Sequence, residues 1–204
     1  MIVLSSLRPA VFLLVPLLWT CAPAQPAASA QPAPAPIARS EGLILQAGEG
    51  ERRVRRSRAD GQPGLTTPFI LKVDRRNGGS EHLVMGYEEI APGQAIRPHR
   101  HLLADEIIFV HRGSGVASLG DRQGPIGTGG TIYIPRNTRI SLRNTGAEPL
   151  GIAFIFSAPG FEETMRCNSV PAGQEPTTIT PEEQRECAQL GHAESAARPN
   201  DPKK

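Results

Sequence analysis

Residues 93–113 read GQAIRPHRHLLADEIIFVHRG. His99 and His101 are separated by a single residue, so both imidazoles point to the same face if this segment is an extended strand. Glu106 follows at the head of an apolar run. Imidazole nitrogens and a carboxylate are common ligands of transition metals. The spacing therefore indicates a metal site formed by these three residues.

The apolar run DEIIFVHRG has the composition of a strand. Glu106 shares one face with Ile108 and Val110, and the alternating residues, Ile107 and Phe109 among them, occupy the other. Both faces are apolar, which predicts that the strand is covered on both sides. The carboxylate of Glu106 then points into an apolar interior, where a charge is costly unless it is paired or bound to a cation.

His111 lies on the face of this run opposite to Glu106, so we expect it to be a packed or surface histidine rather than a ligand.

The composition favours an all-β domain. The chain has 204 residues, 39% of them hydrophobic, with 21 glycines, 20 prolines and only 4% aromatic residues, and no long helical periodicity is visible. Turn chemistry separates short strand signals, which is typical of a sandwich or barrel. The strand signals lie at residues 68–73, 81–90, 105–113, 115–120, 131–135, 138–144 and 149–157.

The pattern Gly93-x5-His99-x-His101-x4-Glu106-x6-Gly113 resembles the first motif of the cupin superfamily at every fixed position. The resemblance implies a cupin-type jelly-roll β-barrel. It also implies that His99, His101 and Glu106 face the barrel interior and bind a divalent transition metal, whether Fe, Mn, Ni, Cu or Zn.

The second cupin motif matches only in part. Its positions fall on Gly129, Pro135, Asn137, Ile140 and Asn144, where the family has glycine, proline, glycine, histidine and asparagine. Asn137 is a mild replacement, because asparagine tolerates left-handed backbone conformations. Ile140 replaces the family's last imidazole and cannot donate a lone pair. We expect Ile140 to face inward and to line the pocket together with Ile108.

The resemblance to small quercetin-dioxygenase-like cupins covers residues 82–163. It implies dioxygenase-like or isomerase-like chemistry on a small organic molecule, with open coordination positions for substrate and oxidant. A second interpretation is a cupin that holds a small-molecule ligand without turning it over, with protonated histidines pairing with Glu106 in place of a metal. A third is a structural homodimer joined at sheet edges. Whether the protein is an enzyme stays open at this point.

The N-terminal residues have the order of a secretory signal peptide over residues 1–24, with a cation at Arg8 and an apolar stretch. Residues 25–40 form a Pro/Ala-rich linker, and residues 41–165 are assigned to the barrel. We expect an exported protein, either periplasmic or secreted. The residues before Cys21 also resemble a lipoprotein box, and lipidation there would anchor the protein to a membrane.

The C-terminal segment, residues 166–204, contains Cys167 and Cys187, an even pair that predicts a disulfide in an exported chain. Residues 181–190 are expected to form one short helix, because Thr180 and Glu183 make a capping box. The residues beyond it read as a tail.

Five arginines lie between Arg52 and Arg58, in a chain of net charge +2. Such a run either binds an anionic surface or forms a solvated edge strand or loop. No aromatic side chains are interleaved with it, so we expect no nucleic-acid partner.

Overall fold

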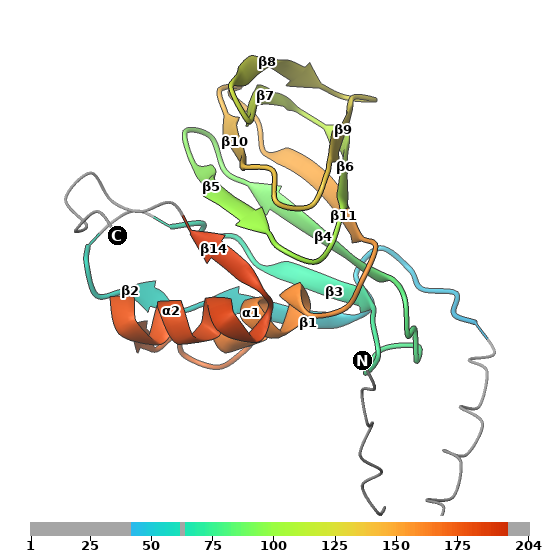
Figure 1. The fold of residues 1–204 in the computed structure, drawn as a ribbon, viewed down its shortest axis with the longest axis vertical. Helices are drawn as coiled ribbons and strands as arrows, with labels where there is room; N and C mark the ends of the chain where they lie inside the picture. Colours follow the sequence, from blue (N-terminus) through green and yellow to red (C-terminus); the bar gives the residue numbers. More distant parts are fainter. Residues whose placement is uncertain (1–41, 62–63, 196–204) are drawn as a thin grey trace, which may run out of the picture. The chain divides into compact units, whose positions relative to one another are not determined.

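The computed structural model describes residues 42–61 and 64–195. Two antiparallel sheets pack around one hydrophobic core, as the all-β jelly-roll interpretation predicts (Figure 1). The signal peptide, the linker and the end of the tail lie outside the described residues and stay expectations.

The larger sheet carries most of the predicted strands. Its order is β12 (Ser169–Pro171), β1 (Glu51–Arg55), β3 (Phe69–Val73), β4 (Val84–Ile90), β11 (Leu150–Phe156), β6 (Glu106–Arg112) and β9 (Thr131–Ile134).

The smaller sheet contains the strand that carries both histidines. Its order is β14 (Ala193–Ser195), β5 (Ala95–His101), β10 (Ile140–Asn144), β7 (Ser114–Leu119) and β8 (Arg122–Gly127). A short parallel pair joins β13 (Thr178–Ile179) to β2 (Ser57–Arg58).

The core lies between the two sheets and follows the strand alternation. On β6, Glu106, Ile108 and Val110 are buried, whereas Ile107 is 41% and Phe109 is 42% exposed. The prediction that both faces of this strand are covered is therefore wrong. The apolar run satisfied the pattern of a doubly covered strand, but the described residues leave its outer face open.

Turn geometry explains two positions of the cupin motifs. Gly113 has φ of 80°, and a Cβ atom added there would lie 2.6 Å from the carbonyl oxygen of Pro149, so a larger residue would clash with the chain. Asn137 adopts φ of 62°, the left-handed conformation that glycine holds in the family motif and that asparagine tolerates.

Asn144 links the end of β10 to two other segments of the same chain. Its side chain is fully buried and donates to the carbonyl oxygens of Ile90 at 2.7 Å and Glu148 at 2.8 Å, while its own oxygen accepts from Gly146 N at 2.9 Å. A buried amide with all these partners satisfies carbonyls that would otherwise be orphaned, and it fixes where β10 ends.

The arginine-rich segment is not a free loop, because it forms β1 and β2, and only β2 lies at a sheet edge. Its first part is β1, which pairs with β12 on one side and β3 on the other. Ion pairs hold most of its arginines in place, so little of the run remains to bind an anionic surface. The pairs are Arg53 with Glu51, Arg55 with Glu88, Arg56 with Glu183 and Arg58 with Asp60.

The described part of the chain contains two short helices where the sequence predicted one. α2 (Pro181–Leu190) begins at Thr180, whose hydroxyl accepts from Glu183 N at 3.1 Å while the Glu183 carboxylate accepts from Thr180 N at 2.7 Å. α1 (Phe161–Cys167) was not expected, because Pro159 and Gly160 read as a turn and seven residues give no clear periodicity. Packing against α2 stabilises it instead.

The C-terminal segment is part of both sheets rather than a separate appendage. β12 extends the larger sheet beside β1, and β14 extends the smaller sheet beside β5. A disulfide joins Cys167 at the end of α1 to Cys187 on α2, and the Thr164 hydroxyl donates to the carbonyl oxygen of Cys187 at 2.9 Å. None of the described helices is long and apolar enough to cross a membrane.

Replacing both Cys167 and Cys187 by alanine is expected to lower the free energy of unfolding by about 3 kcal/mol, because the disulfide closes a loop of 20 residues in the unfolded chain. Urea unfolding monitored by circular dichroism measures the change. Wild-type protein unfolded under reducing conditions is the control and should approach the double variant. Equal midpoints for oxidised wild type and variant would contradict this role.

Candidate metal centre and cavity

The three predicted ligands come together at the reversal between β5 and β6. His99 and His101 lie on β5, residues 102–105 turn the chain, and Glu106 begins β6. One ligand atom from each residue lies within 4.8 Å of the others. His101 Nε2 is 3.1 Å from Glu106 Oε2. His99 and His101 are two residues apart on one strand, so their side chains share a face. The tight reversal after β5 then brings Glu106 next to them.

Burial makes this cluster energetically demanding. His101 is 2% exposed and Glu106 is 5% exposed. Both ring nitrogens of His101 and the Oε2 atom of Glu106 have no hydrogen-bond partner among the described residues. A buried polar group without a partner costs about 1–3 kcal/mol, and more when it is charged. A cation bound between these atoms would satisfy them, so the donor set fits a transition metal.

His99 is oriented by the backbone. Its Nδ1 atom lies 2.8 Å from the carbonyl oxygen of Arg97. Because a carbonyl can only accept, Nδ1 carries the hydrogen, and Nε2 keeps the lone pair that a metal needs. Burial and the neighbouring His101 hold the pKa of His99 below its ordinary value. The ring therefore favours the neutral form in which imidazole binds metals.

Aromatic rings enclose the two histidines. The ring of Phe161, on α1, meets His101 edge-on with centroids 4.2 Å apart and stacks on His99 at 5.8 Å. Phe156, on β11 directly opposite Glu106, packs against the other side of His101 at 4.9 Å. These rings cover part of the His101 imidazole. The sequence did not reveal the role of Phe161, because it depends on a helix that was not expected.

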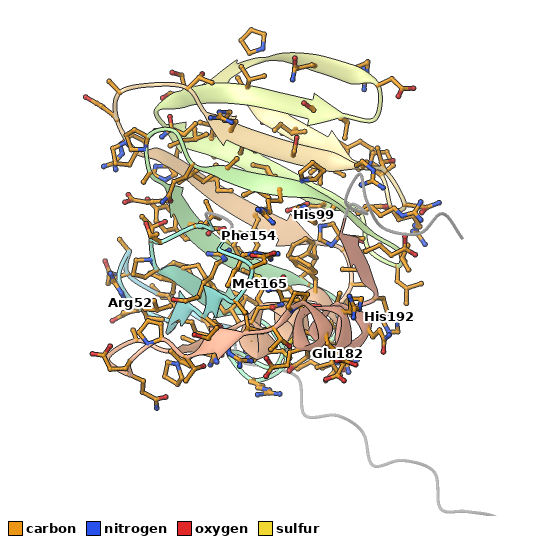
Figure 2. The ribbon with its side chains drawn as sticks, turned by 90° about the vertical axis from the view of Figure 1, so that its left-hand side faces the viewer. Arg52, His99, Phe154, Met165, Glu182 and His192 are labelled. Atoms are coloured by element: carbon orange, nitrogen blue, oxygen red, sulfur yellow. A yellow bond between two sulfur atoms is a disulfide. The ribbon has the colours of Figure 1, made fainter. Side chains whose placement is uncertain are left out.

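Two of the three donors, His99 and Glu106, line a cavity of about 240 Å³. His99, Phe154 and Met165 line it from β5, β11 and α1 respectively (Figure 2). Ile108 lines it, in agreement with its assigned face on β6. The volume is below the roughly 300–1,000 Å³ of sites for drug-sized ligands, so the cavity suits a smaller organic molecule.

Ile140 lies beside the site but does not line the cavity. It is fully buried and pairs with His99 across β5 and β10, so both side chains emerge on the same face of the smaller sheet. The inward orientation matches the expectation. The expected contact with the cavity does not occur, because Ile140 is packed within the hydrophobic core cluster.

A second charged pair lines the same cavity. Glu88, on β4, is 2% exposed and forms an ion pair with Arg55 at the end of β1. Burial raises the pKa of Glu88, Arg55 opposes that effect, and the negative charge of Glu106 adds to the rise. Glu88 pairs with Phe69 on β3 and with Ile152 on β11, and both of these partners are buried. Paired residues share a face of the sheet, so Glu88 faces inward.

Two other polar residues near the motif lie away from the cavity. Tyr133 on β9 is 57% exposed, and Glu89 forms an ion pair with Arg112. Neither is positioned to replace the missing fourth ligand.

A family model described as the cupin domain matches residues 86–156. That span contains the three clustered donors and Ile140. Residues 86–156 are a cupin domain.

The chain matches its curated relatives over part of its length. It is 32% identical to auxin-binding protein 1 of Arabidopsis thaliana over 108 residues, 48% of this chain and 53% of that protein. It is 32% identical to the dimethylsulfoniopropionate lyase DddW of Ruegeria pomeroyi over 80 residues, 39% of this chain and 51% of that protein. The chain thus spans about half the length of these curated relatives.

A solved structure with a similar fold is a predicted oxalate decarboxylase from Thermotoga maritima. The two are 18% identical, with a TM-score of 0.49, and the match covers 57% of this chain and all of that one.

Substitution of Ile140 by histidine is expected to strengthen metal binding, because the new imidazole would emerge beside His99. Without metal, burial of the polar ring should cost about 2–4 kcal/mol of stability. Thermal unfolding with and without Zn²⁺ would show a larger metal-induced increase in Tm for I140H than for wild type.

The matched control is L142H, because Leu142 is equally buried on the same strand but pairs with Ile96 rather than with His99. An equal Zn²⁺ effect on I140H and L142H would contradict the geometric argument.

Proposed function

We propose that this protein is an exported cupin that binds a divalent transition metal through His99, His101 and Glu106 and uses it to convert a small organic molecule held in the cavity. The observation that carries the proposal is the convergence of three donors, of which His101 and Glu106 are buried and have ligand atoms without hydrogen-bond partners in the described part of the chain. When bound, such a metal supplies Lewis acidity and open coordination positions for substrate or oxidant. Dioxygenase-like or isomerising chemistry follows from the cupin resemblance.

The residues of the chain have separate tasks in this proposal. The Arg97 carbonyl orients His99, and Glu106 supplies the negative charge that stabilises the cation. Phe156 and Phe161 cover part of the His101 imidazole, and apolar surroundings strengthen electrostatic interactions in the site. Glu88, paired with Arg55, places a charged side-chain pair on the cavity wall beside a bound molecule.

A binding protein without catalytic turnover is the second candidate. Ile140 leaves three donors where the family motif provides four, which weakens the grip on a metal. The relatives include both kinds of protein by name, an auxin-binding protein and a dimethylsulfoniopropionate lyase. The apolar walls of the cavity serve either role.

Export rests on the expected signal peptide and is supported by the disulfide between Cys167 and Cys187, since such bonds persist in oxidising compartments. Periplasmic or secreted localisation, with Cys21 lipidation as the membrane-bound variant, is part of the proposal.

We also propose that the protein forms a homodimer. The exposed side chains of Ile107 and Phe109 on β6 and Tyr133 on the adjoining edge strand β9 are suited to that contact.

Replacing His101 by alanine is expected to reduce bound metal at least tenfold, because one of three donors is lost. Elemental analysis of protein purified without chelators, and of apo-protein reloaded with Zn²⁺ or Fe²⁺, measures the effect. The matched control is H111A, since His111 is exposed on the opposite face of β6. Equal metal content in wild type and H101A would remove the proposed metal centre.

Metal-loaded wild type is expected to consume oxygen when a small β-diketone or a flavonol is added, because both compounds present oxygen donors to a metal with open positions. An oxygen electrode follows the reaction, with H101A as the inactive control and H111A as the active one. Binding of these compounds without oxygen uptake or product formation would favour the binding protein.

A further inference from the structure

Four arginines line the cavity, and the metal centre accounts for none of them. Arg55 ends β1, and its guanidinium lies 4.8 Å over the ring of Phe69, which sets its orientation. Its Nη1 atom is buried and forms an ion pair with Glu88 Oε1, which uses one side of the guanidinium. Guanidinium carries five donors, so this group can still bind an anion inside the cavity.

The other arginines beside the cavity are committed elsewhere or exposed. Arg56 donates to Glu183 and to the carbonyl oxygen of Thr178, and Arg58 donates to both carboxylate oxygens of Asp60. Arg97 is exposed on β5. Among these arginines, Arg55 is therefore the one best placed to bind an anion next to the buried apolar side chains of the cavity.

Charge balance indicates what the cavity would bind. Glu88 and Glu106 contribute two negative charges and Arg55 one positive charge. A divalent cation at Glu106 then leaves one positive charge in excess. An uncompensated charge among side chains such as Ile108, Ile152 and Phe154 is costly, whereas one anionic group would neutralise it.

We propose that Arg55, held by Glu88 and Phe69, is an anion subsite that selects small organic molecules with a single carboxylate, whose carbon chain packs against the apolar wall. The anion subsite deepens the proposed function by naming a substrate class. It rests on the proposed function in one respect, the positive charge of the bound metal. Arg55 is a specificity-determining residue here, because its guanidinium contacts the carboxylate of the bound molecule.

The test compares butanoate with butanamide, which have nearly the same shape but differ in charge. Binding to full-length protein, with and without Zn²⁺, is measured by heteronuclear NMR titration in a buffer without carboxylates. Zn²⁺-loaded wild type is expected to bind butanoate at least tenfold more tightly than butanamide. R55Q is expected to reduce this preference to less than threefold, because the charge-assisted hydrogen bonds are lost.

The matched control is R112Q. Arg112 pairs with Glu89, the neighbour of Glu88 on β4, but this pair lies outside the cavity, so R112Q should keep the wild-type preference. Because R55Q strands the buried charge of Glu88, the double variant R55M/E88L is tested beside it. An apolar pair of similar volume preserves folding in many proteins. R55M/E88L should bind Zn²⁺ like wild type and lose the preference for butanoate.

The outcomes separate the two proposals. Zn²⁺ uptake with a butanoate preference that survives in both R55Q and R55M/E88L would overturn the subsite and leave the metal centre intact. Failure of Zn²⁺-loaded wild type to prefer butanoate would also overturn it. If wild type takes up no Zn²⁺, the metal centre fails, and the subsite stands only if butanoate still binds in an Arg55-dependent manner.

Discussion

A carboxylate inside an apolar barrel needs a counter-charge, and Glu106 is the residue on which this requirement falls. It lies at the first position of β6, between Phe156 of β11 and Ile134 of β9, with 5% of its surface exposed. His101 is 3.1 Å away and offers ring nitrogens without hydrogen-bond partners among the described residues. A cation shared with the two histidines, or a proton transferred to them, resolves the charge. The proposed metal centre corresponds to the first of these solutions.

A second buried carboxylate in the cavity, that of Glu88, also needs a counter-charge, and a side chain of the protein supplies it. Glu88 is as deeply buried as Glu106, but it has Arg55 as a partner on a strand far away in sequence. An internal ion pair is weak evidence for stability, since apolar replacements are often as stable. Its placement next to a cluster of metal-ligating groups makes a binding role a better explanation than a structural one.

The arginine-rich β1 links the barrel to the C-terminal segment. Arg53 donates to the carbonyl oxygens of Arg166 and Ser169, and Arg166 pairs with Glu51, Glu163 and the fully buried Asp74. This network holds α1 against the larger sheet, and α1 in turn presents Phe161 to the histidines. The C-terminal segment thus contributes to the cavity directly, through residues such as Ile179 and Ala188 in its wall, and also by positioning Phe161.

The sequence by itself determined the all-β class, half of the described strands and the three clustered donors, because these depend on local spacing. Alternation places His99 and His101 on one face, and turn residues such as Gly113 mark where strands reverse. It also determined the capped start of α2, since the interactions of Thr180 and Glu183 span three residues.

Tertiary structure alone decided the Arg55–Glu88 pair, the covering of His101 by Phe161 and the open outer face of β6. Each depends on which distant segment packs against a given strand, and periodicity along one strand does not contain that information. The packing of Ile140 in the core rather than on the cavity wall has the same cause. Alternation gives the side a residue faces, whereas the space left there is set by neighbours from other strands.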